Sequence, residues 1–155
     1  MEARASTTLL WPTHARLRFV QALRVALAQI NSTVGDLPGN CALIASWASR
    51  AAQEGAQVVL FPEMAVTGYP VEDLALRPSF ARASKQALEE LALTLDRSGC
   101  GDTVVVVGYL DRDQAGSRNS AAVLFGGAVL SRYDKHALPT YRSSTNCGTS
   151  HPVRA

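Results

Sequence analysis

Short runs of consecutive apolar residues alternate along the chain with stretches in which apolar residues recur every three or four positions. The runs at 23–30, 56–61 and 103–110 are short and aliphatic, which predicts three buried strands. The second run has no polar alternation and therefore indicates cover on both faces of its strand. Four consecutive valines in the third run are typical of a central strand.

Two segments between these runs have helical spacing. From Asn40, a candidate N-cap, apolar residues recur every three or four positions as far as Gly55, which can end the helix. A second amphipathic segment starts near "RPSF" at 77–80 and closes before "RSGCGD" at 97–102. Each segment is expected to form a helix that lays its apolar side on a sheet.

A hairpin is predicted at 120–134, "SAAVLFGGAVLSRYD", because two apolar arms flank a pair of glycines that accept a positive φ. The preceding polar stretch, 111–119, is expected to be a loop. The order strand, helix, strand, helix, strand, hairpin predicts an α/β layered fold. Parallel neighbours need crossover helices, and both faces of the sheet need cover.

Composition narrows the class of protein. The 155 residues suffice for one domain, and a net charge of +2 is too small to indicate a nucleic-acid partner. No apolar stretch approaches the roughly 20 residues that a membrane-spanning helix needs. Three scattered cysteines favour a reducing, cytoplasmic location, and three scattered histidines have no metal-ligand spacing, so no metal is expected.

The ordered pattern is confined to residues 23–141. Residues 1–22 carry Arg, Ser and Thr with a single acid, weakly like a transit peptide, and are interpreted as a disordered extension or a misassigned start. Residues 142–155, "RSSTNCGTSHPVRA", have no apolar period and are dense in Ser and Thr. We expect this tail to be aberrant, as an out-of-frame translation would be.

Glu63 is the first candidate for chemistry, because functional groups in open α/β sheets gather just beyond the carboxyl ends of strands. A carboxylate there can equally cap a turn or pair with a loop cation, and position alone leaves both open. Lys135 follows the predicted hairpin beside His136, where a solvated lysine is ordinary. No dinucleotide fingerprint or phosphate loop is present. Cys41 and Cys100 have no partner base in the sequence pattern.

Three segments carry a family resemblance: "LRVALAQINSTVGDLPGN" at 23–40, "GAQVVLFPEMAVTGYPVEDLALRPSF" at 55–80 and "NSAAVLFGGAVLSRYDKHALPTY" at 119–141. Together they resemble the nitrilase superfamily of carbon-nitrogen hydrolases, most closely the amino-terminal glutaminase domain of glutamine-dependent NAD synthetases. The resemblance implies a partial nitrilase-like α-β-β-α sandwich, with a mixed sheet and flanking helices.

The resemblance also implies roles for three residues. Glu63 matches the general base, Lys135 the lysine that stabilises the oxyanion, and Tyr141 a residue that helps hold the substrate glutamine. In the family these groups serve a cysteine that attacks the side-chain amide of glutamine and forms a thioester. The chemistry is coherent, because a thiol needs a base and the developing negative charge needs a cation.

The nucleophilic cysteine of the family comes on a later strand, and we expect it to be absent from this chain, which would stop before that strand. Cys147 is not expected to replace it, because a nucleophile needs a fixed geometry. The resemblance implies no cofactor for this domain, and ATP and Mg for a full-length enzyme. The implied partners are L-glutamine, a synthetase domain and further copies in a homo-oligomer.

Two other functions stay open. The chain could come from a stand-alone amidase of the same superfamily, although "GYPVEDL" at 68–74 favours the synthetase. It could instead be a non-catalytic interaction module, because an open sheet edge and apolar surface invite a partner. As an isolated chain it is expected not to hydrolyse glutamine.

Overall fold

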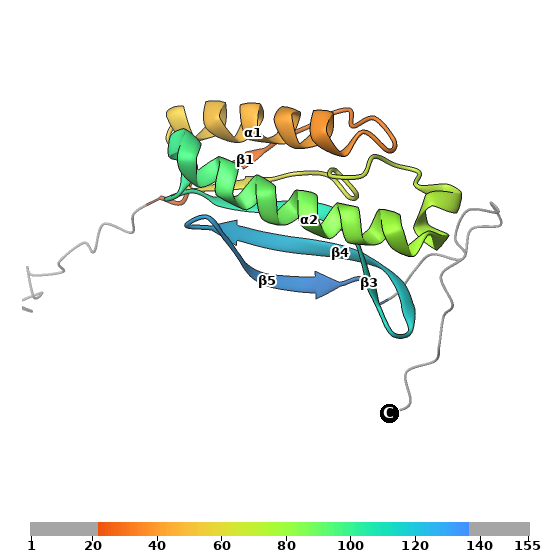
Figure 1. Ribbon diagram of the computed structural model, residues 1–155. Coiled ribbons are helices and arrows are strands. Elements are labelled where there is room, and N and C mark those ends of the chain that lie inside the picture. The colour runs from red at the N-terminus through yellow and green to blue at the C-terminus, as the bar shows by residue number, and fades with distance from the viewer. Residues whose placement is uncertain (1–21, 137–155) are drawn as a thin grey trace, which may run out of the picture.

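Five strands form one mixed sheet in the order β1-β2-β3-β4-β5 in the computed structural model, which describes residues 22–136 (Figure 1). Strands β1, β2 and β3 are parallel to one another. Strand β4 is antiparallel to β3, and β5 is antiparallel to β4. The mixed α/β sheet predicted from the sequence is confirmed. The strands are β1 Val25–Leu27, β2 Val58–Leu60, β3 Val104–Asp113, β4 Gly116–Phe125 and β5 Ala128–Asp134.

Two helices, α1 (Leu37–Gln53) and α2 (Pro78–Leu95), connect the parallel strands and lie side by side on one face of the sheet (Figure 1). Both crossovers step in the same direction along the sheet, and the right-handed rule then puts both helices on the same side. Neither helix of the described region combines the length and apolarity that a membrane span requires. The core lies between the helices and the sheet, and its fully buried residues include Ile44, Val59, Leu88, Leu91 and Val107.

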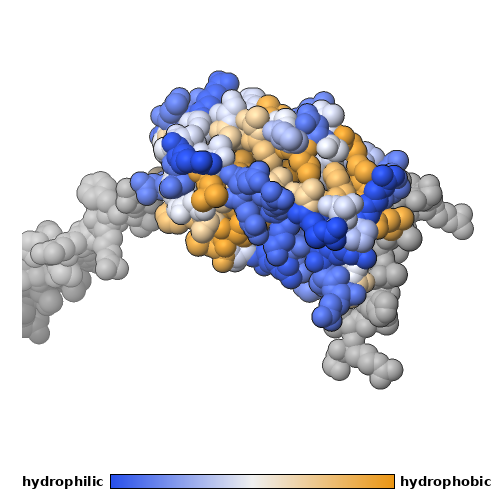
Figure 2. Space-filling view, viewed as in Figure 1, coloured by the Kyte–Doolittle hydropathy of each residue, from blue (hydrophilic) through white to orange (hydrophobic). Residues whose placement is uncertain are grey.

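Cover on both faces of the sheet was predicted. Within residues 22–136 the helices cover one face, and the other is covered at β3 by the loop after β2 but open at β1 and β2. Val59 is completely buried beneath the helices, so its neighbour Leu60 points to the opposite face and is 36% exposed. Leu27, paired with Leu60 in the sheet, is 68% exposed. On the helical side, Figure 2 shows a band of apolar side chains between the polar outer sides of α1 and α2.

The predicted loop at 111–119 is wrong, because β3 and β4 continue through it as a long hairpin. The register runs to the pair Asp113 and Gly116. The Asp113 carboxylate closes the turn by accepting from the N–H groups of Ala115 at 2.8 Å and Gly116 at 3.1 Å. The tip of this hairpin is partly exposed and consists mainly of polar residues. It therefore shows no apolar run, which is the pattern from which a buried strand is predicted.

The predicted N-cap at Asn40 is also wrong. Helix α1 begins at Leu37, and the Asp36 carboxylate caps it by accepting from the N–H of Gly39 at 3.0 Å. Asn40 is only 2% exposed, and its side-chain amide joins two loops. It accepts from the N–H of Thr33 at 2.8 Å, and it donates to the carbonyls of Thr33 at 2.8 Å and Val66 at 3.1 Å.

Replacing Asn40 by alanine is expected to lower the free energy of unfolding by about 2 to 3 kcal/mol, because the change removes three hydrogen bonds and leaves buried backbone groups unpaired. Urea unfolding followed by circular dichroism measures the loss. Asn31→Ala is the matched control, because Asn31 is exposed and the same change there should cost about 0.5 kcal/mol or less. Equal losses in the two variants would contradict the bridging role of Asn40.

Candidate active site

Glu63 lies on a loop that leaves the carboxyl end of β2 and crosses over β3. Gly108 of β3 lies directly beneath this loop, and a Cβ built on it would approach the Pro62 carbonyl oxygen to 2.7 Å and the Met64 backbone more closely still. Real Cβ atoms essentially never come so near to backbone, so only glycine permits this crossing. Gly108 therefore fixes the height of Glu63 above the sheet.

The loop is held from both sides. The N–H of Val66 donates to the Gly108 carbonyl at 3.1 Å, and the N–H of Gly35 donates to the Thr67 carbonyl at 2.9 Å. Met64 has φ of 54°, a left-handed conformation that costs energy for a residue with a branched or long side chain. Such strain persists only where the surroundings over-determine the backbone, as they do beside Glu63.

One carboxylate oxygen of Glu63, Oε1, contacts two residues, Asn119 of β4 and Lys135, which follows β5. The Lys135 Nζ lies 3.1 Å from Glu63 Oε1, and the side-chain amide of Asn119 donates to the same oxygen. The N–H of Lys135 also donates to the Asn119 carbonyl at 2.8 Å. The structure thus brings together the two site residues singled out in the sequence, which are 72 positions apart, and adds Asn119.

Asn119 was missed because it was assigned to a loop rather than to β4. On β4 its side chain shares a face with Ala121, the alternate position of the same strand, and so points to the side where Glu63 lies. A polar residue directly before the apolar arm "SAAVLF" was the available signal. Its amide binds Glu63 while its backbone binds Lys135, so one residue connects both members of the pair.

A cavity of about 280 Å³ lies over the pair, bounded by β3, β4 and the loop after β2. The side chains of Glu63 and Lys135 are 48% and 39% exposed, so a small molecule has access to both charges. The cavity combines one carboxylate, one ammonium group and one amide with an apolar wall. The wall residues include Phe61, Pro62, Val106, Ala121 and Tyr133.

The model of the family described as "Carbon-nitrogen hydrolase" matches residues 24–153 of this chain. The chain belongs to the carbon-nitrogen hydrolase family. It is 36% identical over 123 residues to the glutamine-dependent NAD(+) synthetase of Acinetobacter baylyi, covering 79% of this chain and 22% of that protein. The match therefore spans about a fifth of the length of such curated relatives.

Solved structures give the same family neighbours. The glutamine-dependent NAD+ synthetase of Acinetobacter baumannii, solved with adenosine diphosphate, superposes with a TM-score of 0.66 at 35% identity, over 77% of this chain and 22% of that one. A cysteine-to-alanine variant of a Nesterenkonia amidase, solved with butyramide, superposes with a TM-score of 0.61 at 26% identity, over 76% and 44%. The nitrilase-like mixed sheet with flanking helices is thereby confirmed.

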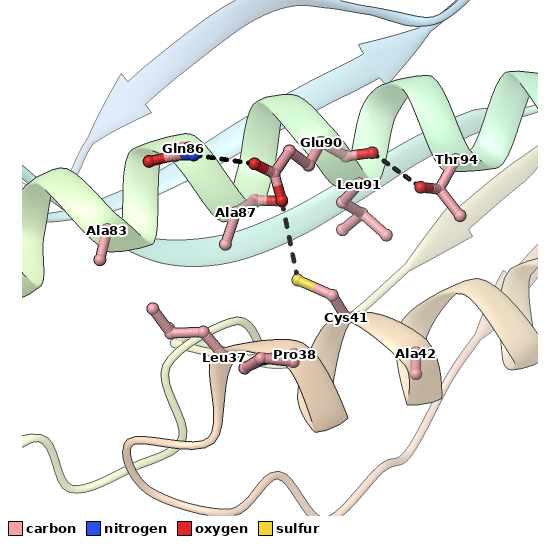
Figure 3. Close-up of a pocket in the computed structure, with 10 residues that line it drawn as sticks. All are labelled: Leu37, Pro38, Cys41, Ala42, Ala83, Gln86, Ala87, Glu90, Leu91 and Thr94. Carbon is pink, nitrogen blue, oxygen red and sulfur yellow. Dashed lines mark hydrogen bonds between the residues drawn. The ribbon is translucent and has the colours of Figure 1, made fainter.

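The two cysteines that the structure describes do not line the cavity over Glu63 and Lys135. Cys41 lies on α1 in another cavity, of about 470 Å³, between the two helices (Figure 3). Its Sγ donates to the Ala87 carbonyl at 3.7 Å. Burial, and then the charge of Glu90, raises the pKa of Cys41 to about 11, so its thiol stays protonated and unreactive. Cys100 is buried.

Two further sequence predictions fall outside the described residues. Tyr141, expected to help hold glutamine, and Cys147, expected not to be the nucleophile, both lie beyond residue 136. The extension 1–22 and the tail 142–155 lie outside the described range apart from residue 22. Between residues 22 and 136 no group of three His, Cys, Asp or Glu side chains is arranged to hold a metal ion.

The charge state of Glu63 follows from its partners. Partial burial by itself raises the pKa of the Glu63 carboxyl. The hydrogen bonds from Asn119 and Lys135, together with the Lys135 charge, outweigh burial and lower this pKa below its usual value. Glu63 is therefore a carboxylate at neutral pH, able to accept a proton.

Lys135→Met is expected to raise the pKa of Glu63, because it removes both a hydrogen bond and a positive charge while burial remains. A titration of the Glu63 carboxyl carbon by NMR measures the change. Lys85→Met is the matched control, since Lys85 is an exposed lysine of α2 that does not contact Glu63. An equal rise in both variants would contradict a specific pair.

The same variant tests the sign of the linkage to stability. Because the folded pKa of Glu63 is below the unfolded value, the pair stabilises the protein above the unfolded pKa and loses this effect as pH falls through the folded pKa. The Lys135→Met variant should thus unfold more easily than the parent at neutral pH, and the difference should vanish in acid. We expect a difference below about 1 kcal/mol, because both side chains are partly exposed.

Proposed function

We propose that Glu63 and Lys135 are the proton acceptor and the oxyanion-stabilising cation of an amide-hydrolysing site. The observation that carries the proposal is their contact at 3.1 Å, beneath an accessible cavity, in a chain of the carbon-nitrogen hydrolase family. Each group has the charge that its role requires. An ionised carboxylate can take a proton, and a fixed cation lowers the energy of negative charge developing on a carbonyl oxygen.

The proposed reaction proceeds through a thioester. Glu63 takes the proton of a cysteine thiol, the sulfur attacks the amide carbon, and Lys135 stabilises the oxygen of the tetrahedral intermediate. Glu63 then returns the proton to the leaving nitrogen, which departs as ammonia. Water, deprotonated by Glu63, hydrolyses the thioester to a carboxylic acid and restores the thiol. Asn119 keeps Glu63 in place during all of these proton transfers through its amide hydrogen bond.

The substrate we propose is L-glutamine, and the site would be the ammonia-supplying part of a glutamine-dependent NAD(+) synthetase. Support comes from relatives of that name, among them one that is 36% identical to this chain. The segment "GYPVEDL" at 68–74 also resembles the glutaminase domain of such synthetases. The ammonia would pass to adenylated nicotinic acid adenine dinucleotide on a synthetase domain that uses ATP and Mg. We further propose a cytoplasmic homo-oligomer, with Tyr141 at the glutamine.

A simple amidase is the second candidate. It is favoured by the structural similarity to the Nesterenkonia amidase, of which one variant was solved with butyramide. The cavity of about 280 Å³ accommodates a small aliphatic amide as well as the glutamine side chain. The two candidates share the same chemistry at Glu63 and Lys135 and differ in what binds the rest of the substrate.

The chain itself is expected to release no measurable ammonia from L-glutamine, because no cysteine of the described residues lines the Glu63 cavity. A coupled glutamate assay on the purified chain measures this. Hydrolysis that persists in a Cys41→Ala, Cys100→Ala double variant and is lost in Cys147→Ala would contradict the expectation. It would identify Cys147 as the nucleophile.

Binding can be tested without turnover. L-Glutamine should shift the NMR signals of the Lys135 ammonium group and the Glu63 carboxyl group, because its amide lies in the cavity against both groups in the proposed complex. L-Asparagine, which is one methylene shorter, should shift them less, and in a Glu63→Gln variant the Lys135 signal should respond weakly to L-glutamine. Shifts with butyramide and none with L-glutamine would favour the simple amidase. No shift with any amide would contradict the proposed site.

A further inference from the structure

A second polar cluster joins β3, β4 and β5 on the sheet face that the helices cover. Asp111 of β3 is its centre and is only 3% exposed. Its Oδ2 accepts from the Tyr109 hydroxyl at 2.8 Å and from Arg132 Nη1 of β5 at 2.5 Å. Its Oδ1 accepts from the N–H of Arg112 at 2.7 Å. Through Arg132, Asp111 therefore links β5 to β3 across the intervening strand β4.

Asp134, the last residue of β5, completes the cluster. The Ser120 hydroxyl of β4 donates to Asp134 Oδ1 at 2.7 Å, and Arg132 Nη2 lies 3.8 Å from Asp134 Oδ2. Ser120 is 2% exposed, so this hydrogen bond is shielded from water. Within the described residues, side chains on the helix-facing side of β5 therefore bind both its neighbour β4 and the next strand, β3.

The two clusters are arranged back to back. Successive side chains of a strand point to opposite faces, so Ser120 and Asn119 point to opposite sides of β4. At the end of β5, Asp134 binds Ser120 on the helix side, and Lys135 binds Glu63 on the other. Lys135 and Asn119, the two residues that bind Glu63, are therefore each one position from a residue of the cluster on the helix side, Asp134 and Ser120 respectively.

Two features of β5 bear on how its register is held. β5 is exposed along nearly its whole length, and its pairing with β4 contains an irregularity between Val123 and Leu124. Backbone hydrogen bonds repeat along a strand, so they do not by themselves select one register. A slip of one residue past the irregularity would move Lys135 to the helix-covered face, away from Glu63.

We propose that the reverse-face cluster, made of Asp111, Ser120, Arg132 and Asp134, positions Lys135 against Glu63 by fixing the register of β5. These are positioning residues, since none of them contacts the Glu63 carboxylate or lies on the same face as it. The inference deepens the proposed function and rests on it for its catalytic meaning. The geometry it predicts is measurable in the chain without any substrate.

The test measures how strongly Lys135 acts on Glu63. The pKa of the Glu63 carboxyl is measured by carbon NMR with and without Lys135→Met, first in the parent and then in an Arg132→Met background. The difference within each background cancels the direct field of Arg132, so it reports the Lys135 contact alone. Arg118→Met is the matched control background, because Arg118 of β4 forms a partly exposed pair with Asp113 of β3 at 2.9 Å, in the adjoining hairpin.

We expect the Lys135-dependent shift to shrink to about half or less in the Arg132→Met background and to stay at the parental value in the Arg118→Met background. A parental shift in a folded Arg132→Met protein would overturn the proposal. Equal shrinkage in both backgrounds would also overturn it, because any loss of a hairpin ion pair would then suffice.

Arg132→Met leaves the buried Asp111 carboxylate without its cation, so the variant could fail to fold. Ser120→Ala is therefore measured in parallel, since it removes one hydroxyl and changes no charge. The proposal predicts a smaller Lys135-dependent shift there too, and an unchanged shift in the folded Ser120→Ala protein would overturn it. Because no amide ligand is present, failure of glutamine binding would leave these results intact and would count only against the proposed function.

Discussion

A carboxylate and an ammonium group that are 72 residues apart in the chain lie 3.1 Å apart in space, and much of the architecture serves this contact. Parallel pairing of β2 with β3 delivers Glu63 beyond a strand end, and the antiparallel β3-β4-β5 hairpins carry Lys135 back to the same place. Gly108 lets the Glu63 loop cross β3 at backbone contact distance. Asn119 binds both partners.

The pair adds little to the stability of the fold. Both side chains are more than a third exposed, and exposed ion pairs contribute about 1 kcal/mol or less. The surroundings meanwhile include a left-handed Met64 and a crossing that excludes every side chain at position 108. A structure that accepts strain for a weakly stabilising contact is typical of a functional site. The ionised state of Glu63 at neutral pH agrees with this interpretation.

The sequence predicted the elements that have strong apolar patterns. The strands at 56–61 and 103–110, the second helix and the glycine hairpin all appear, although β2 is shorter than its apolar run and β3 longer. The hairpin tip was missed because a partly exposed ladder needs no apolar side chains. The N-cap was misplaced by four residues, because both Asp36 and Asn40 suit a cap and only the tertiary contacts of Asn40 assign it to another role.

The site was predictable in part. Glu63 and Lys135 follow from the family resemblance, and the strand-end rule supports Glu63 independently. Asn119, Gly108 and the reverse-face cluster could not be predicted, because each acts through a neighbour that only the register of the sheet brings close. In the sequence Gly108 only follows a run of valines, and Arg132 and Asp134 are only charged residues within a predicted hairpin.

The most direct test of the account is an NMR experiment that transfers magnetisation from the Lys135 ammonium nitrogen across its hydrogen bond to a carboxyl carbon. A correlation with the Glu63 carboxyl at neutral pH, lost when acid protonates Glu63, is the predicted result. If Lys135 instead shows no such correlation and its ammonium protons exchange with water as fast as those of Lys85, the pair does not exist in solution and the central claim is wrong.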